Sequence, residues 1–358
     1  MLVLLLVLGL VLLVVGGEAL VRGAGGLARA FGLSPLVIGL TVVAAATSAP
    51  ELSVTLTATL DGAPGLAVGN VVGSNIANVL LVLGAAALIA PLVVGRSTMR
   101  VDLPVVVALS VLTWVLTLDG TVSRWEGGLL LVLLVAYVVY SVVASRAASG
   151  GGEEETAPGD GSRSKAFTLV RDAVLVAVGV GMLVGGAQAL VFSASAIAAD
   201  LGVSDLVVGL TVVAIGTSLP ELATSVVAVA RGHTDLAIGN VVGSNLFNIG
   251  TVLGTTGLLT PGGVPVEASS VRVDLPVMIA VVVVLMVLAF AANRLSRRDG
   301  LLLLLGYAAY LAYLVLDARG SDVLGAYLQV LGVVGALAVV AMVAAVALEV
   351  RGRRRVRA

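Results

Sequence analysis

Two glutamates occupy matching places inside long apolar stretches of this chain. Glu51 lies within the apolar run 34–60, and Glu221 lies within the apolar run 205–230. A carboxylate at membrane depth costs several kcal/mol unless it is paired, protonated or bound to a cation, so such a residue is a functional candidate by default. Two of them at equivalent positions indicate a shared role, and cation binding is the chemistry that this placement favours.

The residues beside each glutamate supply further oxygen atoms. Pro50 and Pro220 directly precede the glutamates, and a proline leaves the carbonyl one turn earlier, at Ala46 or Gly216, without its helical donor. We therefore predict a broken helix at each site. Hydroxyl groups accompany these breaks at Thr47, Ser48, Thr217 and Ser218. Carboxylate, hydroxyl and carbonyl oxygens are hard ligands, which suit Ca²⁺ or Na⁺ better than soft metals.

The next apolar run in each half carries a second polar group. Ser74 and Asn78 are four residues apart and share one helical face, and Ser244 and Asn248 repeat the pattern. An amide oxygen is a neutral cation ligand. Polar side chains in membrane helices also serve as interhelical hydrogen-bond partners. Ion binding and structural bonding both remain open for Asn70, Asn75, Asn240 and Asn245.

These polar residues belong to an internal repeat. Residues 39–84 and 209–254 align without a gap at an offset of 170, and 26 of the 46 positions are identical. The residues VDLP also recur, at 101–104 and 273–276. Glycines spaced by four predict close helix packing at Gly69 and Gly73, and likewise at Gly239 and Gly243.

The elements that must position the repeat are membrane helices. The chain is 59% hydrophobic and 11% charged, whereas soluble domains are about 25% charged. A helix needs roughly 20 apolar residues to span a bilayer, and strand-like alternation is absent. We therefore predict an all-α polytopic membrane protein. Its eleven apolar runs are 2–30, 34–60, 65–90, 102–118, 127–145, 167–199, 205–230, 236–259, 274–292, 300–316 and 323–350.

One polar interval divides the chain. Residues 146–166 are rich in Gly, Ser and Glu and predict a flexible linker between an N-terminal half, 1–145, and a C-terminal half, 167–316. Each half has five predicted helices, and an odd number turns the second half over, so we predict inverted-topology repeats. The run 323–350 predicts one extra C-terminal helix, followed by a basic tail at 351–358.

Charge placement predicts the orientation. With the N-terminus outside, sixteen Lys and Arg residues face the cytoplasm and three, Arg124, Arg272 and Arg319, face outward, as cytoplasmic loops favour basic residues. We therefore place the chain in the cell membrane with the linker and the C-terminus in the cytoplasm. A net charge of −1 gives no indication of nucleic-acid binding, and the absence of cysteine excludes thiolate metal sites. No partner protein is indicated, and we expect a monomer.

The motifs GTSLPE at 216–221 and GNVVGSN at 69–75 and 239–245 resemble the repeat signatures of the calcium/cation antiporter superfamily, of the prokaryotic Na⁺/Ca²⁺ exchanger type. The resemblance is strong over the repeats and extends to the layout of the whole chain. It implies two inverted five-helix halves with four ion sites between them. It also implies that Ca²⁺ is bound by the carboxylates of Glu51 and Glu221 and the carbonyls of Thr47 and Thr217. Beyond the glutamates, the implied Na⁺ ligands are Ala44, Ser48, Ser74, Ala214, Ser218 and Ser244, with Asn78 and Asn248 lining the centre.

Three departures from the family pattern are visible. Some relatives carry aspartate where this chain has Asn248. Potassium-dependent exchangers resemble that acidic pattern, so the asparagine disfavours potassium coupling here. Ala46 replaces the glycine of the GTS signature, and the run 323–350 exceeds the ten helices usual for the family.

Together the residues and the resemblance predict a secondary antiporter that exchanges Na⁺ for Ca²⁺ by alternating access, with no cofactor and no enzymatic activity. Two glutamates carry a charge of −2, which one Ca²⁺ or two Na⁺ would neutralise. A third Na⁺, which the resemblance implies, would make exchange electrogenic. The helices at 2–30 and 167–199 would slide past the remaining helices.

Three alternatives remain open at this point. In a proton/cation antiporter the glutamates would carry protons, and uptake driven by a pH step without sodium would identify it. An ion channel would show far higher flux rates. A membrane hydrolase would have to use the two carboxylates as an aspartyl-type dyad, and hydrolytic activity would identify it.

Overall fold

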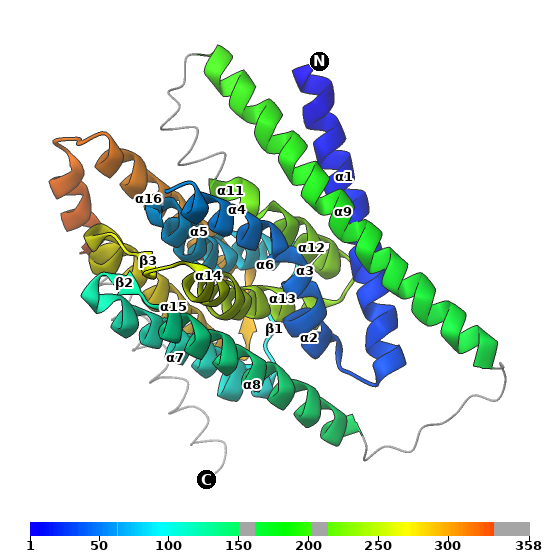
Figure 1. Cartoon of the computed structure of the whole chain (residues 1–358). Coiled ribbons are helices and arrows are strands. Elements are labelled where there is room, and N and C mark those ends of the chain that lie inside the picture. The colour runs from blue at the N-terminus through cyan, green and yellow to red at the C-terminus, as the bar shows by residue number, and fades with distance from the viewer. Residues whose placement is uncertain (63, 150–161, 202–213, 333–358) are drawn as a thin grey trace, which may run out of the picture.

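The computed structural model describes residues 1–62, 64–149, 162–201 and 214–332 (Figure 1). Within these residues the protein is nearly all helical, as predicted, and nine helices are long and apolar enough to cross a membrane. They coincide with nine of the eleven predicted runs: Leu2–Phe31, Pro35–Leu60, Ala67–Ile89, Thr98–Asp119, Arg124–Ala147, Ala166–Asp200, Thr234–Leu259, Ser270–Ala292 and Arg297–Ala318.

The two other predicted runs are only partly described. The run 205–230 is seen from residue 214 onward, as α11 (Ala214–Thr217) and α12 (Leu219–Ala230). The run 323–350 is helical from 324 to 332, and the rest of it lies outside the described residues, as does the basic tail 351–358.

The helices that flank the linker are longer than predicted. Helix α8 (Arg124–Ser149) and helix α9 (Ser162–Asp200) both extend into the interval 146–166, whose central residues, 150–161, lie outside the described part. Ala147 and Ala148 are strong helix formers and prolong α8, and the glycine run begins only at Gly150. The ends of the interval are therefore helical, because their residues favour helix even though the interval as a whole is polar. The division into two halves stays a prediction.

Helices α1 (Leu2–Phe31) and α9 lie side by side along one flank of the molecule (Figure 1). Glycines bring their backbones together: a Cβ added at Gly16 would lie 2.9 Å from the carbonyl oxygen of Gly179, and one at Gly9 would lie 2.9 Å from that of Gly186. Because the contacts run in opposite sequence order, the two helices are antiparallel. Such small-residue contacts hold membrane helices together through close packing.

We expect Gly16→Ala to separate this pair. Alanine forms helix better than glycine by about 1 kcal/mol, so a loss of stability can arise only from new contacts across the pair. The added Cβ would lie 2.9 Å from the carbonyl oxygen of Gly179, 2.9 Å from Cβ of Met182 and 3.0 Å from the backbone nitrogen of Leu183. Thermal unfolding in detergent should occur at a lower temperature. Gly181→Ala in α9 is the matched control, because no described atom lies within 4 Å of a Cβ there. Equal unfolding temperatures for the two variants would contradict the packing argument.

The predicted span 34–60 consists of four consecutive segments. They are α2 (Pro35–Ile38), the π-helical turn η1 (Gly39–Val43), α3 (Ala44–Thr47) and α4 (Ala49–Leu60). The following span comprises α5 (Pro64–Ala77), the π-helical turn η2 (Asn78–Leu83) and α6 (Gly84–Ile89). Its equivalent in the second half has the same sequence of segments: α13 (Thr234–Phe247), the π-helical turn η6 (Asn248–Leu253) and α14 (Gly254–Leu259).

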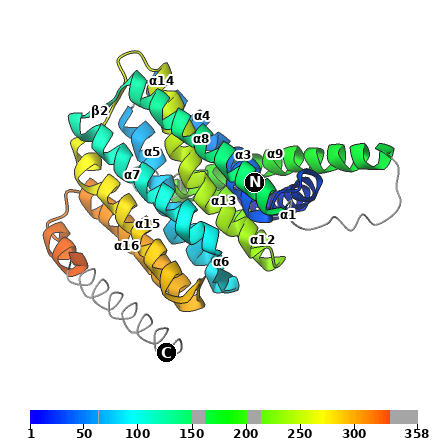
Figure 2. The ribbon, with the colours of Figure 1, turned by 90° about the horizontal axis from the view of Figure 1, so that it is seen from below.

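The remaining helices carry the outer layer of the bundle. The π-helical turn η3 (Thr98–Asp102) continues into α7 (Leu103–Leu116) and the 3₁₀ turn η4 (Thr117–Asp119). In the second half, η7 (Ser270–Asp274) continues into α15 (Leu275–Ala292), and α16 (Arg297–Ala318) follows. Figure 2 shows α15 and α16 on one flank of the bundle and α9 projecting from the opposite flank.

Two short antiparallel strand pairs join loops of the two halves. Strand β1 (Leu92–Val93) pairs with β4 (Arg294–Leu295), and β2 (Thr121–Val122) pairs with β3 (Val264–Pro265). The sequence did not predict them, because two residues are too few for a visible alternation. They fix loops of one half against loops of the other.

The two halves cross closely where α13 packs against α2 and η1. A Cβ at Gly39 would lie 2.6 Å from the carbonyl oxygen of Leu236, and one at Gly243 would lie 2.7 Å from Cβ of Ala44; at Gly239 it would clash with the carbonyl of Leu36. The predicted packing role of Gly239 and Gly243 is therefore confirmed. The structure does not show it for Gly69 and Gly73, where a Cβ would meet no described atom within 4 Å. The stretch equivalent to η1, residues 209–213, lies outside the described residues.

Candidate cation site

Both predicted glutamates stand at helix breaks in the interior. Ser48 interrupts the helix between α3 and α4, and Ser218 does so between α11 and α12. Glu51 and Glu221 follow in the first turn of α4 and α12, and both are fully buried, with 0% of their surface exposed. The first turn of a helix exposes unpaired amide groups and the positive end of the helix dipole, which stabilises a carboxylate there.

The two carboxyl groups lie near each other. They are close enough to interact electrostatically. Helix α4 contacts η6 of the second half, and α12 contacts η2 and α3 of the first half, so each broken helix packs against the other repeat. The two carboxyl groups therefore belong to one site, formed by both halves.

Polar atoms at this site are buried without hydrogen-bond partners among the described residues. All four carboxylate oxygens of Glu51 and Glu221 are in this state. A buried polar atom left without a partner costs about 1–3 kcal/mol, and more when it is charged. A bound cation would provide a partner for carboxylate oxygens in this state. The same two broken helices and the helices that follow them hold further buried oxygens without a hydrogen-bond partner. These atoms are the hydroxyls of Ser48, Ser74, Thr217, Ser218 and Thr224 and the amide oxygens of Asn78 and Asn248.

A reciprocal pair of amide bonds fixes the two central asparagines. The amide nitrogen of Asn78 donates to Oδ1 of Asn245 at 3.1 Å, and that of Asn248 donates to Oδ1 of Asn75 at 3.3 Å. Because the nitrogens are used in this way, the amide oxygens of Asn78 and Asn248 stay free of protein donors. Asn75 and Asn245 thus take the structural role that the sequence left open.

Asn70 and Asn240 also take the structural role. Asn240 donates to the backbone carbonyl of Glu221 at 3.4 Å and to the hydroxyl of Ser225 at 3.0 Å. Asn70 makes the same two bonds in the first half, to the carbonyl of Glu51 at 3.3 Å and to the hydroxyl of Thr55 at 3.0 Å. Each asparagine therefore ties the backbone at its glutamate to the next helix.

Some predicted ligands already have protein partners. The hydroxyl of Thr47 is 3.4 Å from that of Ser244 and donates to Oδ1 of Asn240 at 3.3 Å. The carbonyl of Ala44 accepts from the backbone nitrogen of Ser48 at 2.9 Å. Ala214 is the first residue of α11, on the side of the break away from Glu221. The structure thus places Thr47, Ser244 and Ala44 at the junction of the halves.

Sequence reasoning missed Thr224, whose buried hydroxyl lies one turn after Glu221. The visible signal was a hydroxyl at position i+3 from the glutamate, next to Ser225 in the same helix. Its counterpart in the first repeat is Val54, so the repeat alignment shows no shared polar residue at this position. The site is therefore not fully symmetric.

The donor set defines what the site can do chemically. It combines two carboxylates with neutral hydroxyl and amide oxygens, and among the described residues no group of three or more His, Cys, Asp or Glu could hold a metal. Hard cations prefer such oxygen ligands. Neither glutamate takes part in an ion pair among the described residues. When both are ionised, their charge of −2 suits one divalent or two monovalent cations.

Comparisons with known proteins point the same way. The family model described as "Sodium/calcium exchanger protein" matches residues 1–143 and 172–316. The putative antiporter CaxA of Alkalimonas amylolytica is 37% identical over 313 residues, which cover 84% of this chain and 95% of that protein. The sodium/calcium exchanger MaX1 of Methanosarcina acetivorans is 34% identical, with 87% of this chain and 97% of the relative covered.

A solved structure shares the fold. The sodium-calcium exchanger NCX_Mj, soaked with 10 mM Na⁺ and no Ca²⁺, superimposes with a TM-score of 0.75 at 33% identity. The match covers 87% of this chain and 99% of NCX_Mj.

Proposed function

The chain belongs to the sodium/calcium exchanger protein family, and from this premise we propose that it exchanges Na⁺ for Ca²⁺ across the membrane by alternating access. The family makes it a multi-pass membrane cation antiporter rather than an enzyme. The observation that carries the proposal is the pair of buried carboxylates from the two halves, whose four oxygens have no protein partner among the described residues.

Competition for these carboxylates is the basis of the proposed exchange. Ca²⁺ and Na⁺ both require the charge of Glu51 and Glu221, so they occupy the site in turn. The proposed ligand set also includes Ser48, Ser218, Ser74 and Ser244 and the carbonyls of Thr47, Thr217, Ala44 and Ala214, with Asn78 and Asn248 at the centre. The contacts of α4 with η6 and of α12 with η2 and α3 support this assignment, because they bring the ligand-bearing segments of both repeats together.

Movement of α1 and α9 provides the proposed change of access. These antiparallel helices pack tightly on each other and contact the core mainly through α12, so they can slide as a unit. The antiparallel packing of α1 on its repeat counterpart is what inverted halves require, and it supports that topology. The proposed orientation, with the N-terminus outside, rests on the placement of the basic residues.

Proteoliposomes test the coupling ion. With Na⁺ inside and ⁴⁵Ca²⁺ outside, we expect Ca²⁺ uptake that stops when the Na⁺ gradient is replaced by a K⁺ gradient. Uptake driven by a pH step in the absence of Na⁺ would instead establish the proton/cation alternative. An equal response to all three gradients would contradict coupled exchange.

Membrane potential tests the stoichiometry. With three Na⁺ per Ca²⁺, one positive charge leaves the vesicle per cycle, so an inside-positive potential favours uptake. One charge is worth about 2.3 kcal/mol per 100 mV, so about 60 mV should change the final Ca²⁺ ratio on the order of tenfold. A ratio independent of potential would indicate two Na⁺ per Ca²⁺.

A further inference from the structure

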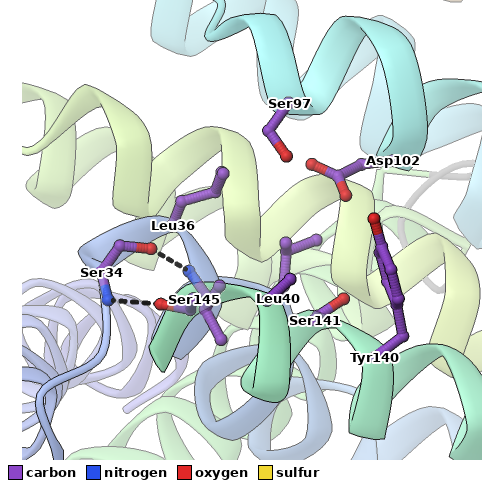
Figure 3. Close-up of a pocket in the computed structure, with 10 residues that line it drawn as sticks. Ser34, Leu36, Leu40, Ser97, Asp102, Tyr140, Ser141 and Ser145 are labelled. Carbon is purple, nitrogen blue, oxygen red and sulfur yellow. Dashed lines mark hydrogen bonds between the residues drawn. The ribbon is translucent and has the colours of Figure 1, made fainter. Parts of the chain in front are cut away.

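A polar cavity lies in the first half, apart from the two glutamates. It has a volume of about 260 Å³ and lies between α2, η3 and the C-terminal part of α8 (Figure 3). Apolar side chains of α2 and η1 form one wall. The polar lining consists of Ser34, Ser97, Asp102, Tyr140, Ser141 and Ser145.

Asp102 is the only carboxylate among the residues that line this cavity. Its side chain is buried, with 4% exposed. The Tyr137 hydroxyl donates to Oδ1 at 2.8 Å. Oδ2 receives no hydrogen bond from the described residues, although Thr98 lies nearby. None of the ion pairs among the described residues includes Asp102. A buried carboxyl oxygen without a hydrogen-bond or ion-pair partner among the described residues therefore lines the cavity.

The surrounding donors converge on this carboxylate. In Figure 3 the hydroxyls of Ser97 and Tyr140 point toward Asp102. The Ser141 side chain lines the same space. Ser97 and Tyr140 are exposed, which gives the cavity a path to the surface. Carboxylate and hydroxyl oxygens are the ligands that hard cations prefer.

From this geometry we propose a second cation site, in which Na⁺ binds Oδ2 of Asp102 together with the hydroxyls of Ser97, Tyr140 and Ser141. The charge of the site favours Na⁺ over Ca²⁺. One carboxylate is neutralised by one Na⁺, whereas Ca²⁺ would leave a positive charge in a confined space. The volume also accommodates several water molecules, each of which takes about 30 Å³, so the ion keeps part of its hydration.

The position of this site relates it to ion entry. The segments that form it adjoin the connections 32–34 and 90–97 and the linker, all predicted to be cytoplasmic. Leu40 of the cavity wall lies one turn before Ala44 in the same broken helix. Na⁺ bound at Asp102 is therefore held on the proposed inner approach to the central site.

The second half offers a matched control. Asp274 is the repeat counterpart of Asp102, and Tyr310 donates to it at 3.2 Å, as Tyr137 does to Asp102. Alignment of the two tyrosines places Leu314 opposite Ser141. The second half thus has the Asp–Tyr pair but lacks a hydroxyl equivalent to that of Ser141.

The test measures equilibrium ²²Na⁺ binding to the purified full-length chain carrying Glu51→Gln and Glu221→Gln, which removes both charges of the central site. We expect saturable binding of one Na⁺ per chain. Adding Asp102→Asn should abolish it, and adding Asp274→Asn should leave it in place. Because the central carboxylates are absent in every sample, the result does not depend on whether the proposed exchange occurs.

Absence of saturable ²²Na⁺ binding, or binding that persists with Asp102→Asn, would overturn the second site. If the Asp102→Asn chain does not elute as a single species, the pair Ser97→Ala and Tyr140→Phe decides the question. This pair keeps the charge but removes two ligands, so a weaker Na⁺ affinity is expected, and unchanged affinity would overturn the proposal.

Discussion

Glu51→Gln and Glu221→Gln are each expected to abolish Na⁺-driven Ca²⁺ uptake into proteoliposomes. Glutamine has nearly the same shape, so the fold should survive while half of the site charge disappears. Removing one partner of a buried charged assembly costs about 3–5 kcal/mol, which corresponds to an affinity loss on the order of 10²–10⁴-fold. Because both halves contribute one carboxylate, the two variants should be equally defective.

Glu126→Gln provides the matched control. Glu126 is also buried, with 5% exposed, but its carboxylate accepts from the backbone nitrogen of Ser123 at 2.7 Å and from its hydroxyl at 2.6 Å. A glutamine oxygen can accept these bonds, so uptake should persist. Normal uptake by either Glu51→Gln or Glu221→Gln would remove the proposed mechanism.

Gly243→Ala is expected to cause a similarly large loss of uptake, although the atoms nearest the new methyl group belong to Leu40 and Ala44 and not to either glutamate. A Cβ here would lie 2.5 Å from the Leu40 carbonyl oxygen and 2.7 Å from Cβ of Ala44. Backbone atoms cannot yield as side chains do, and overpacking costs about 1–3 kcal/mol. The two halves would move apart at the place where their ligands converge, and a displacement of about 1 Å can reduce a rate 10²-fold.

The uptake rate and the unfolding temperature should both fall for Gly243→Ala. Gly128→Ala in α8 serves as the control, because its Cβ would meet only Leu258 at an ordinary 3.8 Å. Wild-type uptake by Gly243→Ala would show that the crossing of α13 with α2 and η1 does not position the site.

The sequence predicted the helices and the burial of the glutamates because membrane helices and intramembrane charges leave strong local signals. Proline before each glutamate also predicted the breaks. It did not predict their position, which is at Ser48 and Ser218, two residues before each proline. Proline is favoured in the first turn of a helix, so here it starts α4 and α12.

The central asparagines show what sequence could not resolve. Their residue types fit both ion binding and helix bonding, and only the cross-repeat pairs Asn78–Asn245 and Asn248–Asn75 separate the two roles. Such pairs join residues 167 and 173 positions apart. The π-helical turns η2 and η6, which begin at Asn78 and Asn248, carry no sequence signal either, yet π-helical turns often mark functional sites.

Equilibrium ⁴⁵Ca²⁺ binding to the purified chain tests most directly whether both carboxylates hold the transported ion. We expect one Ca²⁺ to bind per wild-type chain and to be displaced by Na⁺, and we expect no saturable binding in either Glu51→Gln or Glu221→Gln. Undiminished Ca²⁺ binding in one of these variants, or binding that Na⁺ does not displace, would contradict it.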